Sequence, residues 1–520
     1  MQDEQILLFG FLSIGYWISF NGFVRTPSID AKWDPVFVLT FYCLWFGMEL
    51  PLFTTLKSSV LKFIVVNNTS SYLKHNVDNE PMELPTLPVE APPVEIEVAI
   101  RDRDMDYSVS NQTDLACDPA KARLRVFMYD LPPLLHFGLL GWKGEKDQVW
   151  PNLSNKSQIP SYPGGLNLQH SMEYWLTLDL LSSNVPNIGH TCTAVRVKNS
   201  SQADVVFVPF FSSLSYNKHS KLLGKEKINV NKILQHKLIH FLFGQKEWRR
   251  VGGKDHLIVA HHPNSMLDAR EKLGSAMFVL ADFGRYPAAI ANIEKDIIAP
   301  YRHVVKTVPS TKSATFDERP ILVYFQGAIY RKDGGVIRQE LYYLLKDEEG
   351  VHFTFGSVKG NGINEAGQGM ASSKFCLNIA GDTPSSNRLF DSIASHCVPV
   401  IISDDIELPY EDVLDYSEFC VFVRAADSLR KGYLLNLLRG IGRERWTKMW
   451  DRIKEIVHEF EYQYPSQSGD AVDMIWKAVS RKVSKIKSNR NWKRKNSLGP
   501  YHLQTCSALA YPLRIVVTEV

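Results

Sequence analysis

A Gly-Asp-Thr-Pro-Ser-Ser loop after a short apolar run is the segment whose residue types and spacing most suggest chemistry. Residues 374–380 predict a buried strand, and Ser385 or Ser386 suits the N-cap of a following helix. The first turn of a helix offers unpaired N–H groups and a partial positive charge, which favour anions. Arg388 lies in that turn, and its guanidinium has the forked donors that phosphate oxygens accept. The segment therefore predicts a diphosphate site.

Asp391 lies about one helical turn beyond Arg388 and could accept hydrogen bonds from ribose hydroxyls. A structural alternative is that Ser385 only caps the helix and that Arg388 forms an ion pair with Asp391, three residues further on. Residue types and spacing alone leave these two interpretations equal.

A Gly-rich turn after the apolar run 321–325 is a second candidate ligand site. Gly327 ends the expected strand, where backbone can approach a ligand, and Arg331 or Lys332 could neutralise a departing pyrophosphate. An exposed turn with solvated basic residues is the alternative. Glu407, just after another expected strand, could bind ribose or brace its own loop.

The elements that must position these residues form a repeating pattern from residue 124 onward. Short apolar runs alternate with amphipathic segments, as in parallel strands joined by crossover helices. The expected strands are 124–129, 204–211, 255–260, 276–282, 321–325, 374–380 and 398–403, and the expected helices include 171–181, 230–243, 336–345 and a long one over 446–460. We therefore expect an α/β fold with two doubly wound, Rossmann-like domains and a ligand crevice at the carboxyl ends of their strands.

These segments resemble the exostosin-like glycosyltransferases, family 47, and are most similar to the plant arabinan arabinosyltransferase branch. The resemblance covers about residues 123–487 and rests on the order and spacing of several motifs. They are RVFMYDLP (125–132), YPG (162–164) with Glu173 following, ADVVFVPFFSSLS (203–215), GGKDHLIVA (252–260), KDIIAPY (295–301), YRKDGG (330–335), GDTPSSNRLFDSI (381–393) and IELPYEDV (406–413). The resemblance implies a GT-B fold, a nucleotide-sugar donor held mainly by the C-terminal domain, inversion at the anomeric carbon and Golgi residence. It also favours the donor-phosphate role for Arg388.

With this resemblance, the expected function is transfer of arabinose from a UDP-sugar to a cell-wall polysaccharide such as pectic arabinan. Xylosyl, galactosyl or glucuronosyl transfer within the same family is an alternative. A catalytically silent glycan-binding partner in a glycosyltransferase complex is another. The expected parts of the chain are a membrane anchor region (1–66), a stem (67–122), an acceptor-side domain (123–305), a linker (306–319), a donor-binding domain with a crossing helix (320–465) and a basic tail (466–520).

Inverting sugar transfer needs a group that takes the acceptor proton opposite the leaving diphosphate. His261 and His262, which follow the expected strand 255–260, and Asp282, which ends another, are candidates, and His262 is the one chosen as base. The sequence has no D-x-D motif at an expected strand end. We therefore expect no required metal or cofactor, with the UDP-sugar acting as a substrate.

The N-terminal part predicts a membrane protein of the secretory pathway. Residues 6–24 and 36–53 are apolar runs near the length that spans a bilayer. Either one or two spans would put the later chain in the lumen, and a Golgi membrane location is expected. N-x-S/T glycosylation triplets begin at Asn67, Asn68, Asn111, Asn152, Asn155 and Asn199. Homo- or hetero-oligomers with related glycosyltransferases are also expected.

Charge and cysteines add weaker indications. A formal net charge of +3 is too small to predict a nucleic-acid partner. The basic run 481–495 could bind an acidic polysaccharide or an anionic membrane, although a solvated tail is the preferred interpretation. Cys376, Cys397 and Cys420 stand in apolar runs and are expected to be small buried hydrophobic residues. A Cys117–Cys192 disulfide is compatible with the sequence, and no structural zinc site is expected.

Overall fold

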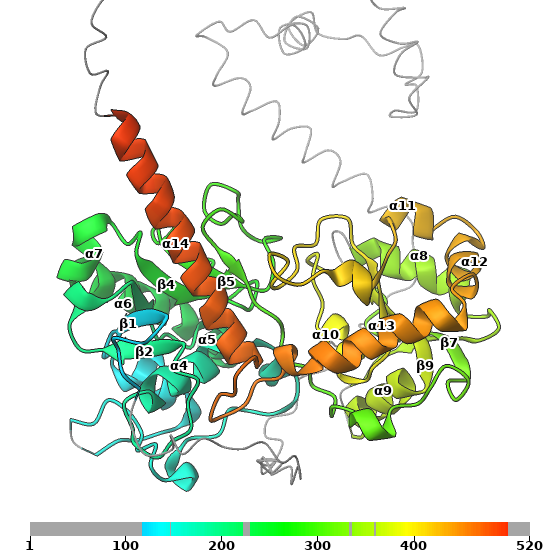
Figure 1. The fold of residues 1–520 in the computed structure, drawn as a ribbon, viewed down its shortest axis with the longest axis horizontal. Coiled ribbons are helices and arrows are strands. Elements are labelled where there is room, and N and C mark those ends of the chain that lie inside the picture. Colours follow the sequence, from blue (N-terminus) through cyan, green and yellow to red (C-terminus); the bar gives the residue numbers. More distant parts are fainter. Residues whose placement is uncertain (1–116, 146, 222–228, 332–334, 358–359, 498–520) are drawn as a thin grey trace, which may run out of the picture. The chain divides into compact units, whose positions relative to one another are not determined.

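The structure, a computed structural model, describes residues 117–145, 147–221, 229–331, 335–357 and 360–497 (Figure 1). Its first sheet has six parallel strands in the order β2-β1-β3-β4-β5-β6. They are β1 (Leu124–Met128), β2 (Ala194–Val197), β3 (Val205–Val208), β4 (His256–Val259), β5 (Met277–Leu280) and β6 (Ile297–Ile298). Strands β3, β4 and β5 are buried over their whole length, because helices cover both faces of a parallel sheet.

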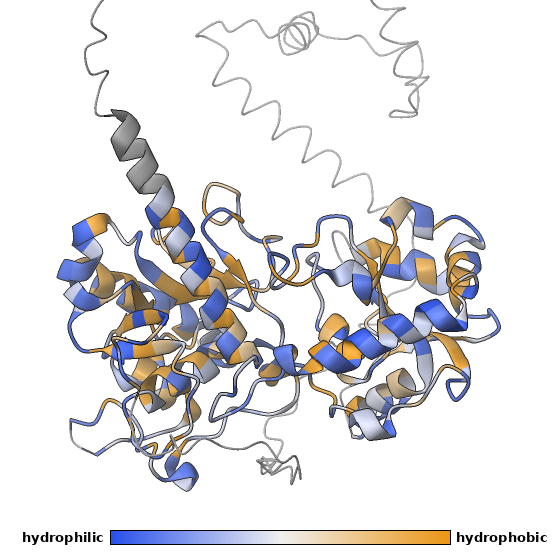
Figure 2. Cartoon of the chain, in the orientation of Figure 1, coloured by the Kyte–Doolittle hydropathy of each residue, from blue (hydrophilic) through white to orange (hydrophobic). Residues whose placement is uncertain are grey.

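Four helices belong to this first sheet: α4 (Met172–Ser182), α5 (Ser212–His219), α6 (Val230–Gly244) and α7 (Lys246–Val251). All residues of α4 are buried, including Glu173 and Asp179. In Figure 2 the strands are mostly orange, which marks apolar residues, whereas many helices also carry blue, polar residues.

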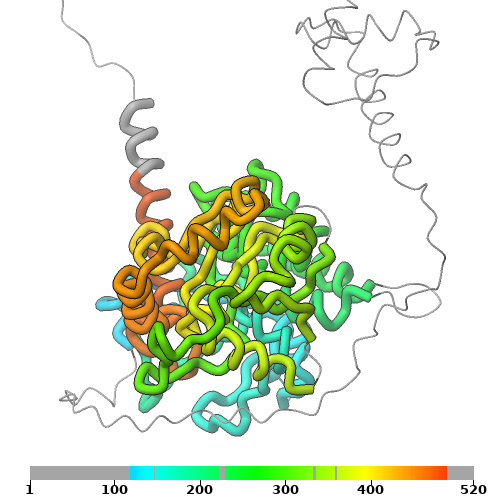
Figure 3. The backbone as a smooth tube through the Cα atoms, turned by 90° about the vertical axis from the view of Figure 1, so that its right-hand side faces the viewer, coloured from blue at the N-terminus to red at the C-terminus, as the bar shows by residue number. Residues whose placement is uncertain are grey.

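The second sheet has five parallel strands in the order β11-β10-β9-β7-β8. Its strands are β7 (Ile321–Gly327), β8 (Val351–Phe355), β9 (Ser373–Ile379), β10 (Val398–Ile402) and β11 (Val421–Phe422). Its helices are α8 (Val336–Leu345), α9 (Gly362–Ala371), α10 (Arg388–Ala394), α11 (Ala425–Ser428), α12 (Tyr433–Arg439) and α13 (Arg443–Ile456). Figure 3, turned by a quarter from Figure 1, shows the orange helical segment beside the yellow segment of the chain, in line with the contacts between α13 and β10. The expected α/β class with two parallel sheets is confirmed.

Both sheets place their first strand between the second and third, which is the doubly wound order of flavodoxin-like folds. In the second sheet the chain therefore turns to opposite sides at β7 and β9. Ligands of open α/β sheets bind outside the carboxyl ends of the strands at this point. The topology therefore predicts a ligand site beside Gln326 and Gly327 at the end of β7 and beside the loop that follows Ile379.

Helix α14 (Ala471–Ser497) returns from the second sheet to the first (Figure 1). The sequence predicts a basic tail over 466–520, which this helix contradicts. Its side chains are described up to residue 488, and Trp476 is fully buried, with its ring centroid 5.8 Å from that of Phe207. Basic side chains of this helix form ion pairs with surrounding acids: Lys477–Asp473, Arg481–Asp412, Lys485–Glu294 and Lys487–Asp204. The tail expectation was wrong for 471–488 because apolar residues recur there at helical spacing.

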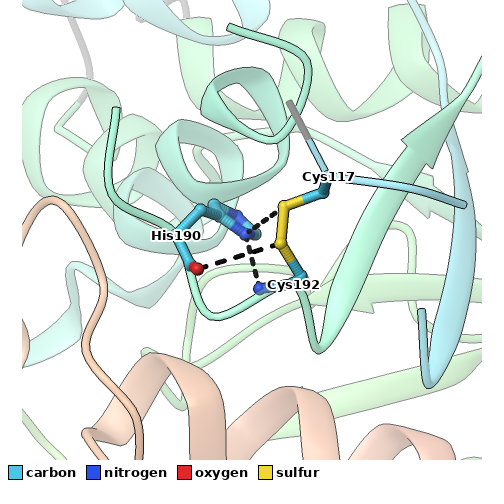
Figure 4. Close-up of side chains that lie close together, drawn as sticks. All are labelled: Cys117, His190 and Cys192. Atoms are coloured by element: carbon cyan, nitrogen blue, oxygen red, sulfur yellow. Dashed lines mark hydrogen bonds between the residues drawn. A yellow bond between two sulfur atoms is a disulfide. The ribbon is translucent and has the colours of Figure 1, made fainter. Parts of the chain in front are cut away.

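Two disulfides cross-link the described chain. Cys376 and Cys397 form one, so the expectation that they are free hydrophobic residues was wrong, whereas Cys420 is free and buried as expected. Cys117 and Cys192 form the other, and His190 Nδ1 lies 3.3 Å from Cys117 Sγ (Figure 4). These three residues have metal-ligand chemistry, but the sulfur atoms are bonded to each other and are not thiolates.

In the described part of the chain, no helix combines the length and apolarity needed to cross a membrane. The apolar runs 6–24 and 36–53, residues 67–116 of the expected stem and the triplets at Asn67, Asn68 and Asn111 lie outside the described residues. The last stem residues, 117–122, are described, and Cys117 is tied to the first-sheet part by its disulfide with Cys192.

Candidate active site

A pocket of about 590 Å³ opens at the carboxyl ends of β7 and β9. One wall comes from the second sheet and includes Gln326, Gly327, Gly381 and Arg388. The other wall comes from loops and short helices that connect strands of the first sheet. Its residues include Leu166, Gln169, His170, Tyr216, His262, Asn264 and Tyr301.

Arg388 is the first residue of α10 and lies at the centre of the second-sheet wall. Its Nε donates a hydrogen bond to the carbonyl of Gln326 at 2.9 Å, and its Nη1 donates to Ser386 Oγ at 3.2 Å. The guanidinium also lies over the ring of Phe325, 4.9 Å from the centroid. Burial lowers the pKa of Arg388 to about 10. The side chain is thus held against the end of β7 in a partly desolvated position.

Arg338 on α8 is a second pocket cation, which the sequence reasoning missed. It is 2% exposed, and it donates to the carbonyls of Ile379, Ala380 and Ala328 at the ends of β9 and β7. Burial, followed by the nearby charges of Arg388 and Arg331, lowers the pKa of Arg338 to about 8. A signal was present in the sequence, because residues 338, 341 and 345 share one helix face and the last two are apolar.

Arg331 is the third arginine of the second-sheet wall, and it forms an ion pair with Asp382 at 3.1 Å. Both side chains are about 40% exposed, at 39% and 41%. Lys332 lies outside the described residues, so its predicted role stays a prediction. Three guanidinium groups, those of Arg331, Arg338 and Arg388, therefore stand beside two carboxylates, Asp382 and Asp391, along this part of the wall. Such an excess of positive charge in a partly buried pocket favours an anionic ligand.

Asp391 does not form the ion pair with Arg388 that was the structural alternative to a ribose contact. One of its oxygens accepts the backbone N–H of Val304 at 2.8 Å, and the other accepts Asn387 Nδ2 at 2.8 Å. Burial raises the pKa of Asp391 to about 6. Asp391 therefore joins α10 to the segment that follows Tyr301, and both carboxylate oxygens already have donors.

The two serines before α10 have separate roles, and neither is the residue directly before the helix, although Ser386 Oγ accepts the backbone N–H of Arg388 at 3.5 Å. The residue before α10 is Asn387, which makes no side-chain cap hydrogen bond, so the expected start at Ser385 or Ser386 was too early. Ser385 bonds to Asp282 and lies 2.8 Å from the hydroxyl of Tyr301, which ties the loop to the first sheet's segments. Ser386 Oγ accepts from Arg388. Glu407 is half-buried and is not among the pocket-lining residues described.

Histidines dominate the facing wall. His170 Nδ1 lies 2.8 Å from His261 Nδ1, and His261 Nε2 lies 3.1 Å from the carbonyl of Ala299. The ring centroids of His170 and His262 are 4.6 Å apart. Burial lowers the pKa of His262 to about 4 and that of His261 to about 3, so both rings are neutral at pH 7.

Comparison with known proteins decides the family. The model of the exostosin GT47 domain matches residues 120–438. This chain belongs to the exostosin GT47 family. It is 36% identical over 409 residues to probable arabinosyltransferase ARAD1 of Arabidopsis thaliana, an alignment that covers 77% of this chain and 88% of the relative. Family membership makes the chain a glycosyltransferase.

Relatives of lower identity are named for different activities. Probable glucuronoxylan glucuronosyltransferase IRX7 of Arabidopsis thaliana is 25% identical over 58% of this chain and 69% of its own. Probable beta-1,4-xylosyltransferase IRX10L of the same plant is 24% identical over 71% of this chain and 84% of its own. Among solved structures, Anabaena HepE in complex with UDP matches 55% of this chain and 79% of its own at 10% identity, but the TM-score of 0.25 carries no argument.

The three described glycosylation triplets of this GT47 chain lie on its surface. Asn152, Asn155 and Asn199 are exposed, and each side-chain oxygen accepts the backbone N–H of the residue two positions later. Exposed turns of this kind are compatible with the predicted glycans, although the modification itself stays a prediction.

Proposed function

We propose that this GT47 glycosyltransferase transfers a sugar, arabinose in our leading assignment, from a UDP-sugar to a cell-wall polysaccharide such as pectic arabinan. The observation that carries the donor assignment is the excess of guanidinium groups at the β7–β9 end of the pocket. A diphosphate is the part of a UDP-sugar that such a group would bind.

Arg388 would make the direct phosphate contact. Nε and one N–H of Nη1 are used by Gln326 and Ser386, and the fork has further donors for phosphate oxygens. Negative charge grows on the diphosphate as the bond to the sugar breaks. A preorganised cation that stabilises this charge acts more strongly in the transition state than in the ground state.

Arg338 and Arg331 would also stabilise the negative charge on the diphosphate. Arg338 is fixed by three carbonyl groups and contributes a rigid positive field. Arg331 is more exposed and could exchange its contact with Asp382 for one with the ligand. With the donor on the second-sheet wall in the GT-B manner, the acceptor would lie on the histidine-lined wall. Direct attack across the pocket would invert the anomeric carbon.

The choice of arabinose rests on the 36% identity to a probable arabinosyltransferase. Relatives named as probable glucuronosyl- and xylosyltransferases make those sugars the next candidates. We extend the proposal to a Golgi membrane location with a lumenal, N-glycosylated catalytic part, anchored through 6–24, 36–53 or both. Assembly with related glycosyltransferases is part of the same proposal.

The test is a donor and acceptor panel with the purified lumenal part. UDP-arabinose, UDP-xylose, UDP-galactose and UDP-glucuronic acid would each be incubated with arabinan, galactan and xylan oligosaccharides, and products identified by mass. The proposal expects a pentose added to arabinan. A silent partner would bind glycan without product for any donor. Because arabinose and xylose add the same mass, the sugar would be reassigned by which donor gives product, and product from a donor other than UDP-arabinose would do so.

A further inference from the structure

The hydrogen bonds of the histidine wall determine which ring nitrogen can take a proton. A neutral imidazole has one N–H and one lone pair, and its tautomer follows from the partners of its two nitrogens. Three neighbouring rings, His170, His261 and His262, can therefore be assigned from their contacts. The inference below rests on the proposed function.

The lone pair of the His262 ring is already used in a hydrogen bond, so it is not available for the predicted role as catalytic base. Its Nδ1 accepts the backbone N–H of Asn264 at 3.1 Å. In the neutral ring the proton is then on Nε2, which can donate a hydrogen bond but cannot accept a proton. The backbone N–H of His262 also donates to Ser213 Oγ, which in turn donates to Glu173. This histidine is thus fixed as a pocket donor.

In the neighbouring pair, His261 and His170, the contacts leave one ring nitrogen with a free lone pair. A carbonyl oxygen only accepts, so the contact between His261 Nε2 and Ala299 O places the proton of His261 on Nε2. Its Nδ1 is then the acceptor, and His170 Nδ1 must be the donor in the 2.8 Å contact between the two rings. The lone pair of neutral His170 is consequently on Nε2.

His170 belongs to the pocket lining, and its Nε2 lone pair is on the side of the ring away from His261. His261 is completely buried, and His170 directs Nδ1 toward it, so Nε2 lies on the other side of the ring. His170 itself lines the pocket that also contains Arg388. The rings of His262 and Tyr301 flank it, with centroids 4.6 and 5.0 Å away.

We propose that His170 Nε2, rather than His262, is the base that accepts the proton of the acceptor hydroxyl. In the step, the acceptor oxygen forms a bond to the anomeric carbon while the bond from that carbon to the diphosphate oxygen breaks. The electron pair of the broken bond goes to the diphosphate beside Arg388. The hydroxyl proton goes to His170 Nε2, and the imidazolium later releases it to solvent.

The decisive experiment replaces His170 by two amides that imitate opposite sides of the ring. His170→Asn places an amide N–H near the position of Nδ1 and keeps the donor to His261, but it has no base. His170→Gln places its amide near Nε2. Turnover (kcat) with the preferred donor and acceptor, UDP affinity by calorimetry and thermal melting would be measured for both. His240→Asn, which changes an exposed histidine on α6, is the matched control.

A base at His170 predicts that both variants lose about 100-fold or more in kcat while UDP affinity is retained. It also predicts that added imidazole restores part of the turnover of His170→Ala, which a purely structural histidine would not show. Wild-type turnover in His170→Asn would overturn the inference, because a donor to His261 would then suffice. Failure of the wild-type protein to transfer any sugar would instead overturn the proposed function and this inference with it.

Discussion

Gly327 is in direct contact with the guanidinium group of Arg388, which occupies the space that a side chain at residue 327 would need. A Cβ atom added to Gly327 would overlap Nη2 and Cζ of Arg388 and lie 2.6 Å from its Nε. The absence of a side chain at the end of β7 therefore lets the arginine lie against the strand and reach Gln326 O.

The first prediction is that Gly327→Ala displaces Arg388 and weakens UDP binding. The expected loss is about 10- to 100-fold, since hydrogen bonds to charged groups contribute about 1.5 to 3 kcal/mol. Titration calorimetry with UDP measures it. Gly244→Ala at the end of α6 is the control, because a Cβ there meets no atom within 4 Å. Unchanged UDP affinity in Gly327→Ala would show that the position of Arg388 is irrelevant to the donor.

A second prediction concerns Arg388 itself. Arg388→Ala should reduce transfer by about 100-fold or more, as when one transition-state donor is removed. Arg388→Lys should restore little, because an ammonium group cannot bond Gln326 O and phosphate as a planar fork does. Rates and melting curves would be compared with Arg443→Ala, which removes a surface ion pair to Asp317. An Arg388→Ala protein that transfers sugar normally would exclude the donor-phosphate role.

The third prediction is a pH dependence of stability at the start of α14. Burial, with the nearby charges of Asp179 and Asp473, raises the pKa of Asp470 from 3.8 to about 7. The folded state then binds a proton that the unfolded state releases, so this contribution is complete below about pH 4 and is lost as the pH rises through about 7. Melting temperature from pH 4 to 8 should therefore fall more steeply for wild type than for Asp470→Asn. Asp347→Asn, an exposed change, should follow wild type, and parallel curves for Asp470→Asn would contradict the assignment.

The fourth prediction concerns the disulfide between Cys376 and Cys397. The bridge spans 21 residues, which include the loop 381–387 and all of α10. Replacing both cysteines by alanine should lower stability by about 3 kcal/mol, in line with a loop of this length. It should also weaken UDP binding, because Arg388 lies inside the loop. Peptide mapping without reduction gives the pairing, and a free thiol at Cys376 would refute it.

How much the sequence predicts differs between central and edge strands. The four strands that the sequence reasoning missed, β2, β6, β8 and β11, are the four edges of the two sheets. Edge strands are short or partly exposed, as the alternating VHFTF of β8 illustrates, so they lack the continuous apolar run of a central strand. The central strands, α4, α6, α8 and α13 were all predicted from such patterns.

The candidate site was predictable only where a loop motif marked it. Arg388 and Gly327 follow expected strands and were identified, whereas Arg338 stands inside an ordinary amphipathic helix. The assignment of His262 over His170 could not be improved from the sequence, because it depends on contacts with residues 261, 264 and 299 that only the fold creates.

The return of α14 to the first sheet changes how this enzyme can be recombined with its relatives. A chimaera cut only at residues 306–319 would take the donor-binding half together with a helix whose Trp476 packs on Phe207 of the other half. The foreign partner would then have to reproduce that packing and the ion pairs of Lys485 and Lys487. A transplant of donor specificity therefore needs two junctions, one in the linker and one before Ala471, so that the first half keeps its own C-terminal helix.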